Sequence, residues 1–295
     1  MFKTKKLYNI EAEMSKEPII FIVGKARSGT SILYRTLQNH PVFSGKTLDL
    51  TESKIIDFSN CSYRLDSLDE NNSAYCYLMK NDTLYRDFIH DIGHLKKYHT
   101  LLKYLLTEKG ARLLSMFYPI WQLSGNRQII RTFFYYAKQA RGVTRILEKT
   151  PNNFLHIKKL RSAFPAGLML YIYRHPIDTY TSYRRRYQID KSAWLNISPR
   201  KFCLRYNWEL NKLLDYERKS PKVFHLIKYE ELTCQPQRVL KELCTFINIE
   251  YRESYFHQEE EPQNFQSDPY LFKPIAKKTK NWQDFISPDD ACYIE

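Results

Sequence analysis

Residues 18–31 read PIIFIVGKARSGTS, and this stretch decides the fold. Its first six residues, 18–23, form an uninterrupted apolar run rich in β-branched side chains, which is typical of a strand buried in a parallel sheet. Gly24 and Gly29 bracket the loop that follows, and residues 31–37 have the apolar spacing of a helix. A strand, a glycine-bracketed loop and a helix form the unit that binds phosphate groups at a helix N-terminus.

The loop is close to a Walker A sequence but lacks its lysine. A Walker A loop reads G-x-x-x-x-G-K-[ST], whereas Thr30 follows Gly29 here. The glycine spacing is still compatible with an anion site, but the missing lysine disfavours an enzyme that uses a nucleoside triphosphate and Mg²⁺. A tight turn without a ligand is the alternative. Arg27, Ser28 and Ser31 favour the anion site, because they add a positive charge and hydroxyl groups beside the helix N-terminus.

Three later apolar runs also end in polar residues. These runs are predicted to be strands at 145–147, 168–173 and 223–227. The polar residues that follow them are Lys149, Arg174 and Tyr229, respectively. Helices are expected after these strands. They lie near 154–164, from just after 176 to about 187, over 199–220 and over 235–247. Asn152 or Asn153 is predicted to cap the first of these helices. The sequence therefore predicts an α/β fold, with a P-loop-like parallel sheet flanked by helices and a ligand site beyond the carboxyl ends of the strands.

The rest of the chain supplies less information about the fold. Residues 1–17 are interpreted as a polar N-terminal tail, and residues 18–295 as a single domain, because no repeat or low-complexity linker divides them. The segment 75–141 is rich in Leu, Tyr, Lys and Phe without strand alternation, so helices that cover the substrate side of the sheet are expected there. The chain after residue 250 is expected to be irregular.

The charge balance favours anionic partners. The chain of 295 residues has 46 Lys and Arg against 32 Asp and Glu, a formal net charge of +14. Nucleotide phosphates, nucleic acid, an acidic glycan and a membrane surface are all compatible with this excess.

The cellular location is predicted from the lack of transmembrane, signal-peptide and cysteine-motif patterns in the sequence. No uncharged apolar run approaches the roughly 18 residues needed to cross a bilayer, so no transmembrane segment is expected. The basic N-terminus has no apolar stretch of the kind found in signal peptides. None of the six cysteines forms a CxxC pair or a zinc-binding spacing, which indicates reduced thiols and no metal site. We therefore expect a cytoplasmic protein.

Four segments resemble the sulfotransferases that use 3′-phosphoadenosine 5′-phosphosulfate (PAPS). PIIFIVGKARSGTSILYRTLQNHP, at 18–41, resembles their 5′-phosphosulfate loop. YIYRHPIDTYTSYRRR, at 171–186, resembles their 3′-phosphate motif, in which an arginine at a strand end precedes a serine by eight residues. LEKTPNNFLHIKKLRSAFP, at 147–165, and IKYEELTCQPQRVLKELCTFI, at 227–247, resemble two further family segments in the same order.

The resemblance implies a set of donor-binding residues. The loop residues would hold the 5′-phosphosulfate: Arg27, Ser28, Gly29, Thr30 and Ser31. The second motif would hold the 3′-phosphate through Arg174 and Ser182, with Arg186 one helical turn further on. Tyr229 would contact the adenine, and Lys273 would return a positive charge to the donor, with Lys277 and Lys278 as alternatives. Independently of the resemblance, a donor with two separate anionic groups needs two anion sites, and arginine suits such groups because its guanidinium binds them bidentately.

The resemblance also implies three catalytic residues. Glu52 would be the general base that takes the proton of the acceptor, Lys149 would stabilise charge in the transition state, and Arg27 would contact the 5′-phosphate. Sulfuryl transfer resembles phosphoryl transfer, in which positioning and charge stabilisation do most of the work. The competing candidates for the base are Asp49, Asp57, His156 and His175.

The sequence therefore predicts a PAPS-dependent sulfotransferase that needs no metal and modifies a hydroxyl or amine group of a small-molecule or glycan acceptor. A nucleotide or small-molecule kinase on the same fold is the alternative enzyme. A basic nucleic-acid-binding module is the alternative outside enzymes, but no RNP1 or helix-turn-helix pattern supports it, and no nucleic-acid partner is expected. The oligomeric state is left open.

Overall fold

The computed structural model describes residues 2–45, 52–56, 83–84, 86–88, 90–91, 118–256, 275 and 281–295. The chain divides into two compact units. Unit 1 comprises residues 1–19 and 42–167, and unit 2 comprises residues 20–41 and 168–295. The prediction of a single domain over 18–295 stays a prediction.

Three parallel strands form the centre of unit 2. They are β1 (Ile20–Gly24), β3 (Leu168–Tyr173) and β4 (Phe224–Lys228). β3 lies between the other two, with Gly24 opposite Ile172 and Ile172 opposite Ile227. All five residues of β1 are buried, which explains its continuous apolar run, because a strand of a parallel sheet is covered on both faces. The predicted strand at 168–173 has the bounds of β3, and the prediction of a parallel α/β sheet is confirmed.

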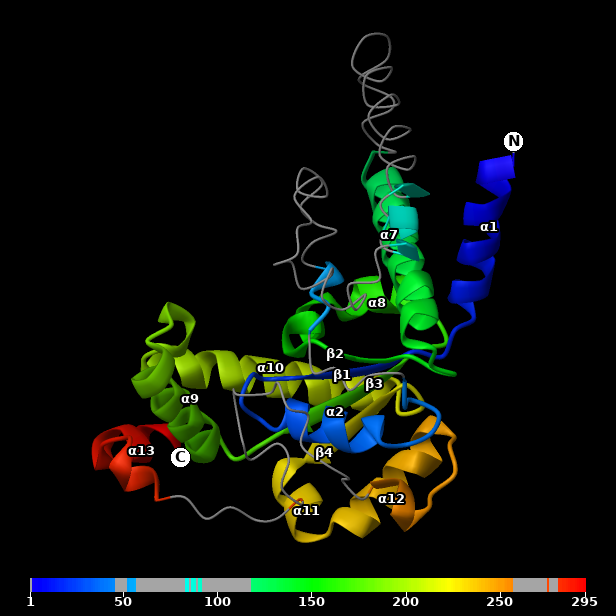
Figure 1. Ribbon diagram of the computed structural model, residues 1–295. Coiled ribbons are helices and arrows are strands. Elements are labelled where there is room, and N and C mark those ends of the chain that lie inside the picture. The colour runs from blue at the N-terminus through cyan, green and yellow to red at the C-terminus, as the bar shows by residue number, and fades with distance from the viewer. Residues whose placement is uncertain are drawn as a thin grey trace. The chain divides into compact units, whose positions relative to one another are not determined.

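The helices of unit 2 follow these strands in the predicted order. They are α2 (Thr30–Gln38), α9 (Pro176–Asp190), α10 (Pro199–Lys219), α11 (Tyr229–Cys234) and α12 (Pro236–Ile247). Short 3₁₀ turns lie at Ala193–Leu195 and Glu253–Phe256. Figure 1 shows α11 and α12 gathered at one end of the unit and α9 at the other. Proline is the first residue of α9, α10 and α12, where its missing N–H has no helical acceptor to lose.

The C-terminal segment contains more regular structure than expected. A 3₁₀ turn, η6 (Trp282–Asp284), precedes the helix α13 (Pro288–Ile294). The Ser287 side chain caps α13 by accepting a hydrogen bond from the N–H of Asp290. α13 is buried through Ala291 and Ile294, which belong to an apolar cluster with α9 and α10. The expectation of an irregular tail is wrong for these residues, because their contacts lie far away in the sequence.

Unit 1 begins with a helix that the sequence did not reveal. α1 (Phe2–Ser15) lies alongside α7 (Tyr118–Arg141), as Figure 1 shows. Ile10 and Met14 are buried, and Glu11 accepts a hydrogen bond of 2.6 Å from Arg131 of α7. The expectation of a polar tail over 1–17 is therefore wrong. Among the α1 side chains that the structure describes, the buried apolar ones are Ile10 and Met14. Ion pairs with α7 supply further contact, so the segment looks polar.

The rest of unit 1 leads into a short strand and helix. β2 (Leu147–Lys149) begins two residues later than expected, and η2 (Pro151–His156) and α8 (Ile157–Ala163) follow it. Neither Asn152 nor Asn153 caps α8, whose preceding residue is His156. α7 confirms the expectation of a helix within 75–141, and most of the remainder of that segment lies outside the described residues.

Candidate active site

Both glycines of the loop between β1 and α2 are required by close contacts in unit 2. A Cβ atom on Gly24 would lie 2.6 Å from the carbonyl oxygen of Ile172 in β3. A Cβ atom on Gly29 would lie 2.5 Å from Cδ2 of Tyr229, and the φ angle of Gly29 is 107°. Any other residue would therefore displace the backbone of β3 or the ring of Tyr229. The scarcity of glycine elsewhere agrees with this specific need.

Ser28 holds the loop in shape. Its buried hydroxyl lies 2.6 Å from the carbonyl oxygen of Lys25 and 2.9 Å from that of Ile172. Its N–H also donates to the carbonyl of Lys25, at 3.2 Å. Ser28 therefore fastens the loop to itself and to β3. Its neighbour Arg27 has a φ angle of 70°, a left-handed conformation that is uncommon for residues other than glycine.

The N-terminus of α2 presents backbone donors next to this loop. The first N–H groups of a helix have no acceptor within the helix, and the residue before α2, Gly29, has no side chain that could accept from them. Thr30 and Ser31 are the first two residues of α2. Unpaired N–H groups and the positive end of the helix dipole together favour an anion.

A hydrogen bond connects two of the predicted phosphate-binding residues in unit 2. Nε of Arg27, in the loop, donates to Oγ of Ser182 in α9 at 3.2 Å. The sequence assigned Arg27 to the 5′-phosphosulfate and Ser182 to the 3′-phosphate, and 155 positions separate them. Their contact brings the glycine loop and α9 to one place in unit 2.

Arg174 follows β3 and precedes α9, and its side chain is largely buried. Its side chain is 11% exposed, and its guanidinium carbon lies 4.5 Å from the centroid of the Tyr229 ring. Nη2 lies 3.6 Å from Oδ2 of Asp178, but Nε is buried and finds no hydrogen-bond partner in the described part of the chain. An orphaned donor on a buried cation is costly, so this position fits an anionic ligand. Because the Tyr229 ring also contacts Gly29, it connects Arg174 with the glycine loop.

The backbone of Arg174 is anchored by a residue that the sequence did not single out. The hydroxyl of Tyr206, in α10, donates to the carbonyl oxygen of Arg174 at 2.6 Å. Burial raises the pKa of this hydroxyl to about 12, so it keeps its proton at neutral pH. α10 thus fixes the strand end from which the Arg174 side chain extends.

The other residues predicted to bind the donor are Arg186, Tyr229 and Lys273. Arg186 pairs with Asp190, four residues further along α9. Tyr229 is buried as the first residue of α11. Lys273, with its alternatives Lys277 and Lys278, lies outside the described residues.

Lys25 forms a buried ion pair that the sequence gave no reason to expect. Its ammonium lies 3.4 Å from Oε2 of Glu209 in α10, and both side chains are almost fully buried. Burial lowers the pKa of the Lys25 ammonium below its usual value, although the nearby Glu209 acts in the opposite direction. Glu209 also accepts a hydrogen bond of 2.6 Å from Arg205. Because a single buried charge is costly, this pair ties the loop to α10.

The predicted base and the predicted lysine meet in unit 1. Nζ of Lys149, at the end of β2, donates to Oε1 of Glu52 at 3.1 Å. The Lys149 side chain is 4% exposed and that of Glu52 is 31% exposed, so the carboxylate is the part of the pair that solvent reaches. The competitors Asp49 and Asp57 lie outside the described residues, and His156 and His175 precede α8 and α9.

Glu148 organises the surroundings of this pair. It is fully buried, and its carboxylate accepts hydrogen bonds from Ser53 at 2.7 Å, Thr150 at 2.6 Å and Asn153 at 2.9 Å. Ser53 is adjacent to Glu52, so Glu148 holds the segment that carries the predicted base against the end of β2. It also explains why Asn153 caps no helix. In the sequence, Glu148 was the first residue of the EKTP turn, but it had no assigned role.

The titration of Glu148 makes stability depend on pH. Burial raises the pKa of its carboxyl, although hydrogen bonds from Thr150 and Ser53 act in the opposite direction. Above about pH 4.5 the unfolded chain has released this proton, whereas the folded protein still binds it. The contribution of Glu148 to the free energy of unfolding is therefore lost as the pH rises from about 4.5 through the raised pKa. We expect the free energy of unfolding of the wild type, minus that of Glu148→Gln, to fall as the pH rises above about 4.5.

Urea unfolding of both proteins at several pH values measures this difference. Glu148→Gln keeps the size of the side chain but cannot ionise, so other titrating groups cancel in the comparison. A difference that is constant or rises with pH would contradict the prediction.

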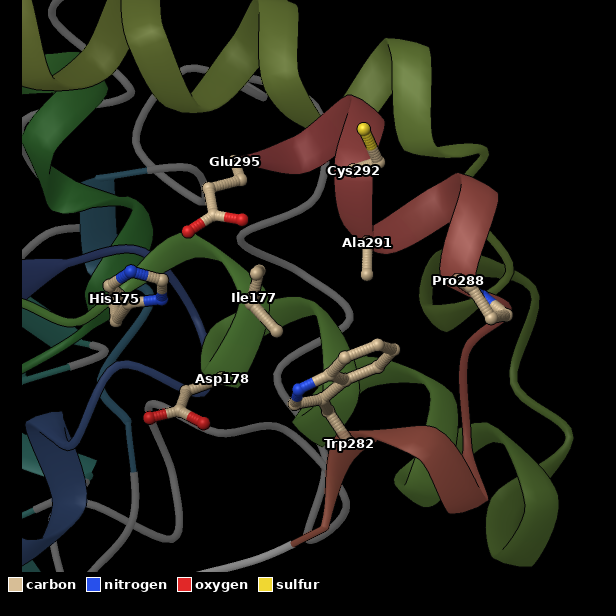
Figure 2. Close-up of a pocket in the computed structure, with 8 residues that line it drawn as sticks. All are labelled: His175, Ile177, Asp178, Trp282, Pro288, Ala291, Cys292 and Glu295. Carbon is tan, nitrogen blue, oxygen red and sulfur yellow. The ribbon is translucent and has the colours of Figure 1, made fainter.

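A separate pocket of about 430 Å³ lies in unit 2, where the first turn of α9 meets η6 and α13. Figure 2 shows the Trp282 ring directed toward Ile177 and Ala291. The eight residues that line it are His175, Ile177, Asp178, Trp282, Pro288, Ala291, Cys292 and Glu295. None of these eight belongs to the predicted donor-binding set, so the pocket differs from the site that the sequence predicts.

The described residues contain neither a metal-binding cluster nor a membrane-spanning helix. Within the part of the chain that the structure describes, no three His, Cys, Asp or Glu residues gather in a way that could hold a metal ion. Among the same residues, no helix combines the length and the apolar character needed to span a membrane.

Comparisons with known proteins agree with this geometry. Residues 18–253 match the family described as the sulfotransferase family. The sulfotransferase domain of the Synechococcus PCC 7002 olefin synthase is similar in structure, with a TM-score of 0.55 and 19% identity over 95% of this chain and 94% of that one. The sulfotransferase domain from the curacin biosynthetic pathway gives a TM-score of 0.52 and 16% identity over 88% of this chain and 83% of that one. At these identities the likenesses show a shared fold. No curated protein matches the chain.

The family match extends from two residues before β1 to the first residue of the 3₁₀ turn Glu253–Phe256. It contains both the glycine loop with its partners in α9 and the Glu52–Lys149 pair with Glu148. Because it covers well over half of the chain, this protein belongs to the sulfotransferase family.

Proposed function

We propose that the protein transfers a sulfuryl group from PAPS to a hydroxyl or amine group of a polar acceptor. The observation that carries the proposal is the buried Nε of Arg174, which none of the described residues accepts from. PAPS has a 5′-phosphosulfate and a separate 3′-phosphate, so it needs two anion sites. The N-terminus of α2 with Arg27 suits the first, and Arg174 with Ser182 suits the second. The contact between Arg27 and Ser182 supports the idea that the two sites hold one ligand.

In the proposed reaction, Glu52 handles the proton of the acceptor, and the glycine loop with α2 handles the leaving group. Glu52 takes the proton of the acceptor as the acceptor oxygen or nitrogen bonds to sulfur and the bond from sulfur to the bridging oxygen breaks. Oε1 of Glu52 accepts from Lys149, so we assign Oε2 to the acceptor proton. Arg27 and the N–H groups of α2 stabilise the negative charge that grows on the departing 5′-phosphate. Lys149 balances charge near the transferred group.

The acceptor that we favour is a small polar molecule or a glycan. The net charge of +14 supports an acceptor of polar or acidic character. The cytoplasmic location and the absence of a nucleic-acid partner stay predictions. The kinase alternative is not favoured, because the chain belongs to the sulfotransferase family and Thr30 occupies the Walker lysine position.

A thermal-shift comparison tests the donor. We expect the product adenosine 3′,5′-bisphosphate to raise Tm without Mg²⁺, because a ligand that binds only the folded state stabilises it by about 1.4 kcal/mol at ten times its Kd. ATP should have a much smaller effect, since it lacks the 3′-phosphate that we assign to Arg174. Equal stabilisation by ATP with Mg²⁺, or none by the bisphosphate, would refute the donor proposal.

A further inference from the structure

The peptide group between Arg174 and His175 is held from two sides in unit 2. Its carbonyl oxygen, which belongs to Arg174, accepts a hydrogen bond of 2.6 Å from the hydroxyl of Tyr206 in α10. Its N–H, which belongs to His175, donates to Oε1 of Glu230 in α11 at 2.8 Å. Both polar atoms of this peptide therefore have a side-chain partner, and the two partners come from different helices. We call Tyr206 and Glu230 the peptide clamp.

The clamped peptide connects two regular elements and belongs to neither of them. β3 ends at Tyr173 and α9 begins at Pro176, and His175 is exposed. Water can satisfy the polar groups of such a connection. Side chains 32 and 55 positions away take this role here, so the clamp restricts the rotation of the peptide from which the Arg174 side chain extends.

The guanidinium of Arg174 is also restricted, and α11 takes part again. The ring of Tyr229, the residue before Glu230, lies 4.5 Å from the guanidinium carbon. Oδ2 of Asp178 lies 3.6 Å from Nη2. Nε is buried, and no acceptor for it exists among the described residues. Arg174 is therefore held at its backbone and at its guanidinium, with one donor still available to a ligand.

The chemistry of the clamp residues suits positioning better than charge attraction. Burial and the Glu230 carboxylate raise the pKa of the Tyr206 hydroxyl to about 12, so it keeps the proton that it donates. Glu230 carries a negative charge, which repels a phosphate and gives no direct help to an anionic ligand. What Glu230 supplies to this place is a hydrogen-bond acceptor for the peptide.

We propose that Tyr206 and Glu230 are positioning residues that make Arg174 selective for the 3′-phosphate of the donor. This inference rests on the proposed function, in which Arg174 binds that phosphate. A side chain that is already held in its binding position loses less conformational freedom when the ligand arrives, so the ligand binds more tightly. A nucleotide without a 3′-phosphate does not use Arg174 and gains nothing from the clamp.

A purely structural role is the alternative for both residues. Glu230 and Tyr206 would then only satisfy two backbone groups before α9. Loss of either side chain would lower the stability of the protein and affect every ligand alike. Positioning of Arg174 affects only the part of the ligand that Arg174 contacts, so measurements of ligand selectivity separate the two roles.

Isothermal titration calorimetry with two nucleotides tests the proposal. Adenosine 3′,5′-bisphosphate and adenosine 5′-monophosphate differ only in the 3′-phosphate, and the selectivity is the Kd of the monophosphate divided by that of the bisphosphate. The wild type should have a selectivity of roughly 10 to 150. Tyr206→Phe and Glu230→Met should each lower it about fivefold, the factor that corresponds to one hydrogen bond of ordinary strength. The Kd of the monophosphate should not change.

Two further variants show how the clamp acts. Glu230→Gln loses the charge but keeps an oxygen that can accept from His175, so its selectivity should stay within about twofold of wild type. Because Glu230→Met loses the same charge, a difference between these two variants assigns the effect to the hydrogen bond. Adding Tyr206→Phe to Arg174→Ala should leave the selectivity of Arg174→Ala unchanged, since the clamp acts through Arg174.

Matched variants control for the type of substitution. Tyr216→Phe removes the hydroxyl of another α10 tyrosine, whose ring stacks on Phe224. Glu231→Met removes the carboxylate of the next residue of α11, which pairs with Arg238. Both should keep the selectivity of the wild type. The Tm of each variant without ligand reports its folding.

Four outcomes would overturn the positioning role and leave the proposed function intact. They are unchanged selectivity in Tyr206→Phe or Glu230→Met, equal weakening of both nucleotides, equal effects of Glu230→Gln and Glu230→Met, and a further loss of selectivity when Tyr206→Phe is added to Arg174→Ala. A wild type that binds the bisphosphate no better than the monophosphate would refute the assignment of Arg174 to the 3′-phosphate, and the positioning role with it.

Discussion

Glu52→Gln should lower kcat by about 10²–10⁴-fold while the affinity for adenosine 3′,5′-bisphosphate stays unchanged, because general-base catalysis contributes about this factor. Glutamine keeps the size of the side chain and can still accept from Lys149 through its amide oxygen, but it cannot take a proton. The loss should fall on kcat, since a base acts in the transition state and not in donor binding. The acceptor is first identified by screening with labelled PAPS. Steady-state kinetics with that acceptor then measures the change in kcat.

Two further variants make this test specific. Glu13→Gln removes an exposed carboxylate from α1 and should leave kcat unchanged. Lys149→Met should also lower kcat, and its combination with Glu52→Gln should cost less than the product of the single effects, because the two residues act as one pair. Turnover of Glu52→Gln within about threefold of wild type would remove Glu52 from the mechanism, and Asp49, Asp57 and His156 would be tested next.

Arg174→Ala should weaken binding of adenosine 3′,5′-bisphosphate by about 1.5–3 kcal/mol, or roughly 10- to 150-fold, the usual value of a hydrogen bond to a charged group. The buried Nε has no hydrogen-bond partner among the residues that the structure describes, so a phosphate that accepts from it gains this interaction without breaking another. Ser182→Ala should cost less, because a neutral hydroxyl contributes less than a guanidinium. Isothermal titration calorimetry measures both affinities.

The ligand without a 3′-phosphate provides the control for this prediction. Adenosine 5′-phosphosulfate should bind Arg174→Ala and the wild type almost equally. Arg218→Ala, which removes an exposed cation near the end of α10, should bind both ligands as the wild type does. Equal losses for the two ligands would mean that Arg174 does not recognise the 3′-phosphate.

Much of the fold follows from local sequence signals. The apolar run at 18–23 contains most of β1 (Ile20–Gly24), and the run at 168–173 becomes β3 with the predicted bounds. α12 begins and ends within one residue of its prediction. These signals are strong because burial on both faces demands continuous apolar strands, and because proline and turn residues mark where helices begin.

The predictions that fail are those in which distant contacts override local appearance. α1 looks polar, but its ion pairs with α7 and the burial of Ile10 and Met14 make it part of unit 1. Asn153 looks like a helix cap, but the buried Glu148 carboxylate takes its side chain. A local pattern cannot reveal a partner whose position is set by the packing of other elements.

The sequence by itself determined the parallel strands, the glycine loop at a helix N-terminus, and a set of candidate residues whose roles came from a resemblance. Only the tertiary structure decided which of those residues meet. Arg27 reaches Ser182 across 155 positions, Lys25 reaches Glu209 across 184, and Ser53 reaches Glu148 across 95. The physical reason is that a buried charge or donor must find its partner in space, and that partner lies on whichever segment the packing of strands and helices brings beside it.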